Sequence, residues 1–309
     1  MKLEGIHHVT AITGDGQRNV DFYVGVMGLR LVKKTVNQDD PSVYHLFYAD
    51  ERGSAGSDIT FFEFPHAGGG HAGAGMVHTV GFRVASEQAL EFWAKRLQAA
   101  GIESRRESAA LSFFDPEGLG LQLRIASSGD QPLIAEHPEI PAELALQGFD
   151  GVRAYAGTPG VADGLLERLG FDRIGAAEWE ARGAARGGLY GYDEPPEGPG
   201  VPGAGTVHHV AWATLPDELG AWRALAVEGG AHPTPTIDRF YFRSIYFREP
   251  TGVLFEVATL GPGFTVDEPL ESLGETLSLP PDYEHLRARA ESTLTPLRNP
   301  REGSDSAAG

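Results

Sequence analysis

The sequence predicts an α+β fold built from four copies of one module, each a strand, a helix and three further strands (βαβββ). The first observation is a helical spacing of apolar residues that appears four times and ends each time at a glycine: Gly28, Gly101, Gly170 and Gly229. Glycine best adopts the left-handed conformation that closes a helix. The second observation is that a short β-like run precedes every helix and two or three more follow it. Because the copies recur at intervals of about sixty to seventy residues, they indicate tandem duplication rather than a solenoid.

The leading strand of each module is expected in a short run rich in apolar and β-branched residues: Ile6–Ile12, Val77–Val84, Val152–Tyr155 and Val207–Ala213. The helix that follows has apolar residues three or four positions apart, as in Leu90, Trp93 and Leu97, which suits one buried face. The four modules are predicted at residues 6–65, 77–126, 149–192 and 206–260.

A stretch rich in Ser, Pro, Asp and Glu, Ser127–Glu143, separates the second module from the third. We therefore expect two domains, 1–130 and 145–262, each with a pair of modules. After Gly261 the chain leaves the repeat. The extension, 263–309, is expected to hold one helix from about Asp282 to Leu294 and a disordered tail, Arg301–Gly309.

Composition excludes several classes of partner. The chain has 25 basic and 43 acidic residues, and this net charge of -18 would repel nucleic-acid phosphates and anionic lipid surfaces. No run of about twenty apolar residues and no secretory signal is present, so we expect no membrane association and a cytoplasmic location. Without cysteine, any bound metal must use His nitrogens and carboxylate oxygens. Whether the chain forms a homo-oligomer stays open.

Two of the four leading strands carry a histidine doublet, His7-His8 and His208-His209, each followed by valine. With 11 histidines in 309 residues, chance gives about 0.4 adjacent pairs, so two doublets at equivalent repeat positions are significant. Neighbouring side chains on a strand point to opposite faces. We therefore expect one histidine of each doublet, His8 and His209, to face a shared cavity, with its neighbour serving another side or a bent edge.

A third ligand is expected at Glu256, a carboxylate within the apolar strand Gly252–Ala258. Burying this charge unpaired would cost several kcal/mol. The second module has Thr79 in place of His209 and Gln122 in place of Glu256, and the third has Gly151 at the histidine position, so histidine and carboxylate disappear together. Two histidines and one carboxylate, with other positions open, are typical of non-haem Fe(II) oxygenases.

One site made from His8, His209 and Glu256 requires the first and fourth modules to share a sheet, and the middle modules then pair as well. Glu63, on the apolar last strand of the first module, is a candidate fourth ligand, although a displacement of this strand by one residue relative to Phe255-Glu256 would count against it. Arg239 and Tyr246 are equally compatible with a surface cation and a core aromatic residue. For the remaining strand and loop histidines a structural role is favoured: His45, His78, His137, His232 and His285.

The chain from Ile6 to about Leu294 resembles the vicinal oxygen chelate superfamily, which includes glyoxalases and extradiol dioxygenases, and within it the ring-cleaving dioxygenases that act on hydroquinones. The resemblance rests on an ordered set of motifs: the His7-His8-Val9 strand with Thr10 and Thr13, Asp21-Phe22-Tyr23 leading to Met27-Gly28, Val32-Lys33-Lys34-Thr35, Tyr44–Asp50, the second doublet, the Glu256 strand, Gly263-Phe264-Thr265 and Ser272-Leu273-Gly274.

The resemblance implies the vicinal oxygen chelate fold and Fe(II), with Mn(II) as the second candidate metal, held by His8, His209 and Glu256. It also implies supporting roles beside the metal for the residues that match His7, Thr10, His208, Arg239 and Tyr246. The implied activity is that of an extradiol-type hydroquinone 1,2-dioxygenase, whose partners are a small aromatic diol and O2.

In this hypothesis His208 or His7 acts as acid and base. Arg239 and Tyr246 stabilise an oxygen-derived anion or orient the second hydroxyl. Two alternatives stay open on the same fold. One is a glyoxalase-like metal-dependent isomerase or lyase, which would want a second carboxylate such as Glu63; the other is a metal-free protein that binds aromatic compounds or drugs.

Overall fold

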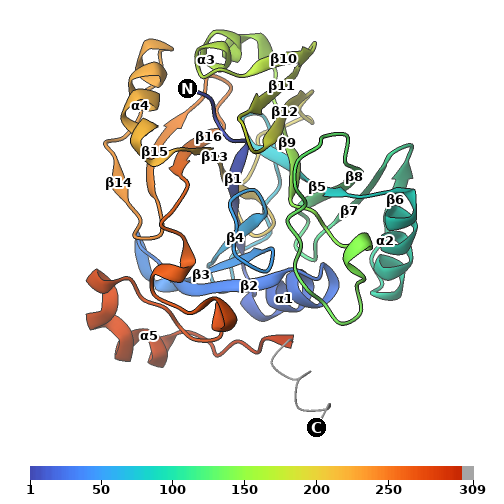
Figure 1. The fold of residues 1–309 in the computed structure, drawn as a ribbon, viewed down its shortest axis with the longest axis vertical. Helices are drawn as coiled ribbons and strands as arrows, with labels where there is room; N and C mark the ends of the chain where they lie inside the picture. The colour runs from blue at the N-terminus through green and yellow to red at the C-terminus, as the bar shows by residue number, and fades with distance from the viewer. Residues whose placement is uncertain (301–309) are drawn as a thin grey trace.

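The computed structural model describes residues 1–300, so the tail predicted to be disordered, Arg301–Gly309, lies outside the described residues. Each predicted module is present as a strand, a helix and three strands (Figure 1). The first module consists of β1 (Ile6–Thr13), α1 (Gly16–Val20) continued by a π-helix (Asp21–Val26), β2 (Arg30–Asn37), β3 (Asp40–Ala49) and β4 (Asp58–Glu63). The second consists of β5 (Val77–Val84), α2 (Glu87–Ala99), β6 (Ser104–Glu107), β7 (Ala110–Phe114) and β8 (Gly120–Ile125).

The second half of the chain repeats this order. The third module consists of β9 (Phe149–Tyr155), a 3-10 turn (Pro159–Ala162) with α3 (Asp163–Arg168), β10 (Asp172–Gly175), β11 (Glu178–Arg182) and β12 (Gly187–Asp193). The fourth consists of β13 (Val207–Thr214), a 3-10 turn (Pro216–Glu218) with α4 (Leu219–Glu228), β14 (Ile237–Asp238), β15 (Arg243–Arg248) and β16 (Leu254–Thr259).

The strands form two eight-stranded sheets. One has the order β14-β15-β16-β13-β1-β4-β3-β2 and the other β10-β11-β12-β9-β5-β8-β7-β6. The first and fourth modules therefore share a sheet through the antiparallel pair β1–β13, and the middle modules share the other through β5–β9, as expected. Figure 1 shows this as the blue first module beside the orange fourth. Because each sheet combines modules from both halves of the chain, the contiguous division into 1–130 and 145–262 stays a prediction.

The helices end as their glycines predict in three modules, where Gly28, Gly101 and Gly170 have φ between 70° and 75°. In the fourth module the prediction of Gly229 is wrong by one residue. Gly229 has φ -78° and is still the last capping position of α4, whereas Gly230 adopts the left-handed conformation with φ 86°. The Ala231 N–H then donates to the Ala226 carbonyl at 2.9 Å, the bond that closes such a helix end.

A β-bulge lies at the start of each leading strand. In the β1–β13 pairing the register passes from Ile6 to His8 and, on the partner strand, from Val207 to His209, so that His7 and His208 are left without an opposite residue. In β5–β9 the same irregularity leaves out His78 and Asp150. A bulge changes the direction of side chains on its strand. It therefore lets both histidines of a doublet approach one another instead of facing opposite sides of the sheet.

The C-terminal extension contains the predicted helix, as a 3-10 turn (Pro281–Leu286) followed by α5 (Arg287–Thr293). It is anchored on the first module by Lys33, whose ammonium group is fully buried, lies 2.7 Å from Asp267 Oδ1 and also pairs with Glu268. Among the described residues, no helix is both long and apolar enough to cross a bilayer.

Candidate metal centre

Three donor atoms from the first and fourth modules meet at the centre of the first sheet. Nε2 of His8 on β1 and Nε2 of His209 on β13 lie 3.2 Å apart. Oε2 of Glu256 on β16 lies 3.2 Å from the first nitrogen and 2.9 Å from the second. All three residues are buried, and Glu256 is 0% exposed. The structure therefore brings together the three residues proposed from the sequence as ligands.

The donor atoms fit a metal ion. Ligands at about 2.1 Å from a metal on neighbouring corners of an octahedron lie about 3 Å apart, close to the separations found here. Oε1 of Glu256 accepts a hydrogen bond from the hydroxyl of Ser244, but no donor among the described residues is aligned on the buried Oε2. Burial alone would raise the pKa of Glu256, yet His8 and His209 beside it hold this pKa well below its usual range. A carboxylate oxygen and two imidazole nitrogens that converge in this way suit a shared cation.

The other histidine of each doublet supports its neighbour. Nδ1 of His7 lies 2.9 Å from Nδ1 of His8, and Nδ1 of His208 lies 2.8 Å from Nδ1 of His209. An imidazole that coordinates through Nε2 carries its proton on Nδ1, so each ligand would donate this proton to the bulged histidine before it. Burial and the proximity of His8 lower the pKa of His7 to about 3, which leaves its ring neutral and able to accept.

A cavity of about 410 Å³ opens beside the three donors, within the range of about 300–1,000 Å³ typical of small-molecule sites. His8, His209 and Glu256 all line it. Many of its other lining residues are aromatic: Phe47, Phe62, Phe64, Tyr241 and Phe242. A second set of lining residues is polar: His45, His208, Arg239 and Tyr246. The cavity therefore offers a flat apolar ligand a place against the candidate metal position.

The predicted supporting residues divide into two groups. His208, Arg239 and Tyr246 line the cavity, whereas His7 and Thr10 are buried behind it. Thr10 is connected to the cavity through Thr60, since their hydroxyls lie 2.9 Å apart and the Thr60 hydroxyl lies 2.8 Å from Nε2 of His45.

His45 lines the cavity, although the sequence favoured a structural role for it. The sequence did offer a signal, because His45 lies between Tyr44 and Leu46 on β3. Side chains alternate along a strand, so the buried Tyr44 and Leu46 point to one face of the sheet and His45 points to the other.

Arg239 and Tyr246 form one unit at the wall of the cavity. Nε of Arg239 donates to the Tyr246 hydroxyl at 3.3 Å, and Tyr246 lies directly opposite Glu256 in the β15–β16 pairing. Burial and the charge of Glu256 raise the pKa of Tyr246 well above its usual range, so its hydroxyl stays protonated. The two amino groups of Arg239 donate to both carboxylate oxygens of Asp39, at 3.2 and 3.0 Å. Sequence reasoning missed Asp39, which lies in the turn between β2 and β3.

Glu63 does not join the cluster of donors. In the β13–β16 pairing Glu256 lies opposite Ala211, two residues after His209, and in β1–β4 the equivalent position opposite Thr10 is Thr60. Glu63 lies three residues further along β4, where its carboxylate accepts from the Gly16 N–H at 3.1 Å. The first module thus has an uncharged threonine where the fourth has its carboxylate.

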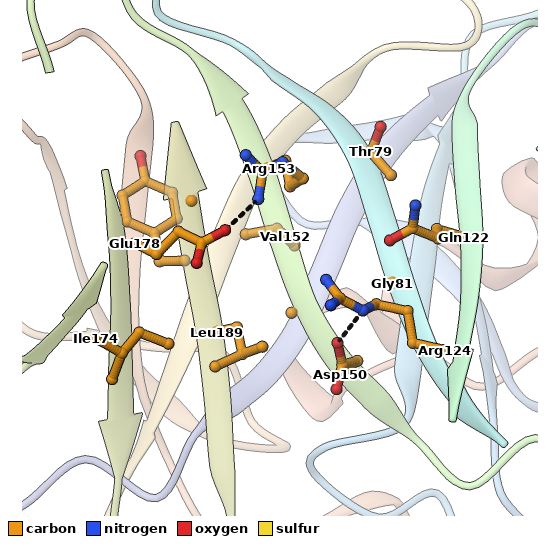
Figure 2. A pocket seen from close by; sticks show the side chains of 13 residues that line it. Thr79, Gly81, Gln122, Arg124, Asp150, Val152, Arg153, Ile174, Glu178 and Leu189 are labelled. Carbon is orange, nitrogen blue, oxygen red and sulfur yellow. Dashed lines mark hydrogen bonds and ion pairs between the residues drawn. The ribbon is translucent and has the colours of Figure 1, made fainter. Parts of the chain in front are cut away.

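The equivalent part of the second sheet holds no comparable set of donors (Figure 2). Its pocket, of about 180 Å³, is lined by Thr79 and Gln122, with Gly151 at the remaining ligand position. A Cβ atom on Gly151 would come within 2.5 Å of the Leu189 side chain, so no ligand side chain fits there.

Two ion pairs line this second pocket. Figure 2 shows Arg153 with Glu178, at 3.0 Å, and Arg124 with Asp150, at 3.5 Å. This agrees with the loss of ligands read from the sequence, and within the described residues the first sheet alone presents a cluster suited to a metal.

Paired βαβββ modules around a buried cluster of two histidines and one carboxylate define a protein of the glyoxalase type with a candidate metal centre. Residues 5–123 match the model of the glyoxalase/bleomycin resistance protein/dioxygenase superfamily. The chain is 40% identical over 318 residues to "Putative ring-cleaving dioxygenase MhqA" of Bacillus subtilis, covering 96% of this chain and 100% of that protein. It is 33% identical over 313 residues to a chlorohydroquinone/hydroquinone 1,2-dioxygenase of Sphingobium indicum, covering 93% and 94%.

Solved structures agree. A crystal structure of a "putative dioxygenase" from Bacillus subtilis is 38% identical, with a TM-score of 0.90 over 96% of this chain and 98% of that one. Glyoxalase I from Zea mays, at 12% identity and a TM-score of 0.58, covers 82% of this chain and 92% of its own and shares the fold alone. The chain belongs to the glyoxalase/bleomycin resistance protein/dioxygenase superfamily, and its predicted vicinal oxygen chelate fold is confirmed.

Proposed function

We propose that this protein is a ring-cleaving dioxygenase that uses Fe(II), with Mn(II) as the second candidate, to insert both atoms of O2 into hydroquinone-type (para-diol) aromatic compounds. The observation that carries the proposal is the convergence of Nε2 of His8, Nε2 of His209 and Oε2 of Glu256 within 3.2 Å at the wall of an aromatic cavity. The similarity to relatives from Bacillus subtilis and Sphingobium indicum that are described as dioxygenases supports the same reaction class.

His8, His209 and Glu256 would hold the metal, and His7 and His208 keep the two ligand imidazoles in the required tautomer. When bound, the metal supplies the orientation and redox coupling that direct reaction between an aromatic diol and O2 lacks. Three ligands from one side leave positions open for two reactants.

The remaining steps belong to side chains of the cavity. Phe62 and Phe242 pack near the ligand histidines, with Phe242 5.1 Å from His8 between ring centres, and provide apolar surfaces for an aromatic ring. His208 is the acid/base group of this proposal, because it lines the cavity whereas His7 is buried behind it. Tyr246 donates a hydrogen bond to the anion that develops on oxygen, and Arg239 supplies a positive charge beside it.

A glyoxalase-like isomerase or lyase was expected to need a second carboxylate. At the symmetry-related position the chain has Thr60, and Glu63 is occupied with the Gly16 backbone, so this alternative loses the feature that favoured it. A metal-free binding protein would have no use for a buried carboxylate that converges with two imidazole nitrogens, an arrangement that is costly to keep in a protein interior. The dioxygenase is therefore the better supported function.

The experiment is anaerobic reconstitution with Fe(II), followed by oxygen uptake with hydroquinone, its methylated and chlorinated forms, and catechol. We expect uptake with the para-diols and ring-opened products that carry two atoms from labelled O2. The Glu256→Gln variant is the control, since it keeps the shape of the side chain and removes the ligand charge. Uptake with catechol alone would overturn the para-diol assignment, and no uptake with any diol would overturn the dioxygenase.

A further inference from the structure

The guanidinium group of Arg239 has hydrogen-bond partners from two modules: the neutral Tyr246 hydroxyl and the charged Asp39 carboxylate. Its Nε–H points to the Tyr246 hydroxyl within the fourth module, and both amino groups point to the Asp39 carboxylate of the first. A bidentate pairing of this kind fixes the plane of the guanidinium as well as its position. Because the plane is fixed, the direction of the Nε–H toward Tyr246 is fixed too.

A second hydrogen bond joins the two loops that carry these residues, since the side-chain amide of Gln38 donates to the backbone carbonyl of Arg239 at 2.9 Å. Gln38 is itself held by the C-terminal extension, where the Tyr283 hydroxyl donates to the Gln38 backbone carbonyl at 2.8 Å. Phe240, directly after Arg239, adopts a positive φ of 69°, a conformation that a bulky side chain rarely takes. The β2–β3 turn and the loop after β14 thus form a defined contact beside the cavity.

Stability does not account for the Asp39–Arg239 pair. The Asp39 side chain is 72% exposed, against 18% for Arg239, and exposed ion pairs contribute little to folding. Both residues nevertheless line the cavity, so the pair lies where the cavity meets solvent. The geometry of the Asp39–Arg239 pair therefore affects the direction of two groups that line the cavity, the Arg239 guanidinium and the Tyr246 hydroxyl.

From this arrangement we propose that Asp39 is a positioning residue: it orients Arg239, and through Arg239 the Tyr246 hydroxyl, toward the oxygen-derived anion. The inference rests on the dioxygenase function proposed above and adds a residue from the first module to that reaction. Asp39 itself does not touch the reacting atoms. The fourth module supplies Arg239 and Tyr246, and Asp39 in the β2–β3 turn of the first module holds both in the orientation that the reaction needs.

The test compares three variants of the full chain loaded with Fe(II). Asp39→Asn removes the charge and keeps the shape, Asp39→Glu retains the charge on a longer arm, and Asp40→Asn is the matched control. Asp40 is the next residue, carries the same charge and contacts Ser42 rather than Arg239. We expect Asp39→Asn to lower kcat about ten-fold, with KM for hydroquinone, metal content and Tm near the wild-type values. Asp39→Glu should recover most of the loss, and Asp40→Asn should behave as wild type.

A double-mutant cycle and a chemical probe complete the test. In an Arg239→Gln background, Asp39→Asn should have no further effect on kcat, because the residue it positions is gone. The rate at which phenylglyoxal modifies Arg239, followed by mass spectrometry, should rise in Asp39→Asn and stay unchanged in Asp40→Asn.

Two failures are distinguishable. Wild-type protein that takes up no oxygen with any diol overturns the proposed function, whatever the probe reports. If the wild type is active, an unchanged kcat in Asp39→Asn, or additive losses in the double variant, overturns the positioning role of Asp39 and leaves the dioxygenase standing. A loss of kcat that Asp40→Asn reproduces also overturns it, because the effect then follows net charge.

Discussion

Replacement of Ser244 by alanine examines how the sheet prepares Glu256 to bind a metal. Ser244 is 0% exposed, and its hydroxyl donates to Oε1 of Glu256, the oxygen that faces away from the two ligand histidines. A hydrogen bond to a charged group is worth about 1.5–3 kcal/mol. Since about 1.4 kcal/mol corresponds to a factor of ten, Ser244→Ala should weaken metal binding about ten- to hundred-fold.

The measurement is an anaerobic competition for Fe(II), and separately for Mn(II), between the protein and a chelator of known affinity. Ser112→Ala is the matched control: Ser112 lies opposite Gln122 in the second sheet and accepts a hydrogen bond from its amide at 3.0 Å, away from the candidate metal. The apo forms of both variants are compared by Tm. Equal metal affinity in the wild type and Ser244→Ala would refute the argument that this hydroxyl holds the carboxylate for coordination.

Three further predictions concern the same centre. Glu256→Gln should abolish stoichiometric metal binding in elemental analysis, whereas Glu63→Gln should retain it, because the Glu63 carboxylate is bonded to the Gly16 backbone instead; loss in both variants would contradict the assignment of ligands. Tyr246→Phe should lower turnover at normal metal content, and unchanged turnover would remove Tyr246 from the mechanism. Thr60→Glu places a carboxylate at the position equivalent to Glu256, so metal should bind at least as tightly while oxygen uptake falls about ten-fold or more; undiminished uptake would show that this side of the metal is not needed by a reactant.

Most of the fold and all three candidate ligands could be predicted because the four modules of the chain can be compared with one another. Four modules with one period align His209 with Thr79 and Gly151, and Glu256 with Gln122. The observed registers agree with this alignment, since Glu256 and Gln122 each lie opposite the residue two positions after the aligned site. A residue that differs from its equivalents in related modules is informative even in a single sequence.

The features that sequence reasoning missed depend on contacts between modules. The bulges at His7 and His208 arise from the pairing of β1 with β13, strands that lie about 200 residues apart, so the rule of alternating faces gave no reason to expect both rings of a doublet to meet. Asp39 has the same origin. As one acidic residue in a polar turn it is unremarkable in sequence, and only the packing of the first module on the fourth brings it to Arg239.

The pairing of the first and fourth modules also explains why only one carboxylate serves two histidines. The two modules are related by an approximate two-fold symmetry that makes His8 and His209 equivalent. The same symmetry makes Thr60 the equivalent of Glu256, so a second carboxylate would stand at Thr60. Threonine there forms hydrogen bonds with Thr10 and His45 and leaves that side of the donors uncharged. A symmetric site with two histidines and two carboxylates would occupy four positions on a metal, whereas the asymmetric one would occupy three. In the proposed dioxygenase, the departure from symmetry at Thr60 would leave room for an aromatic diol and O2 together, in the cavity that His45 and Asp39 also line.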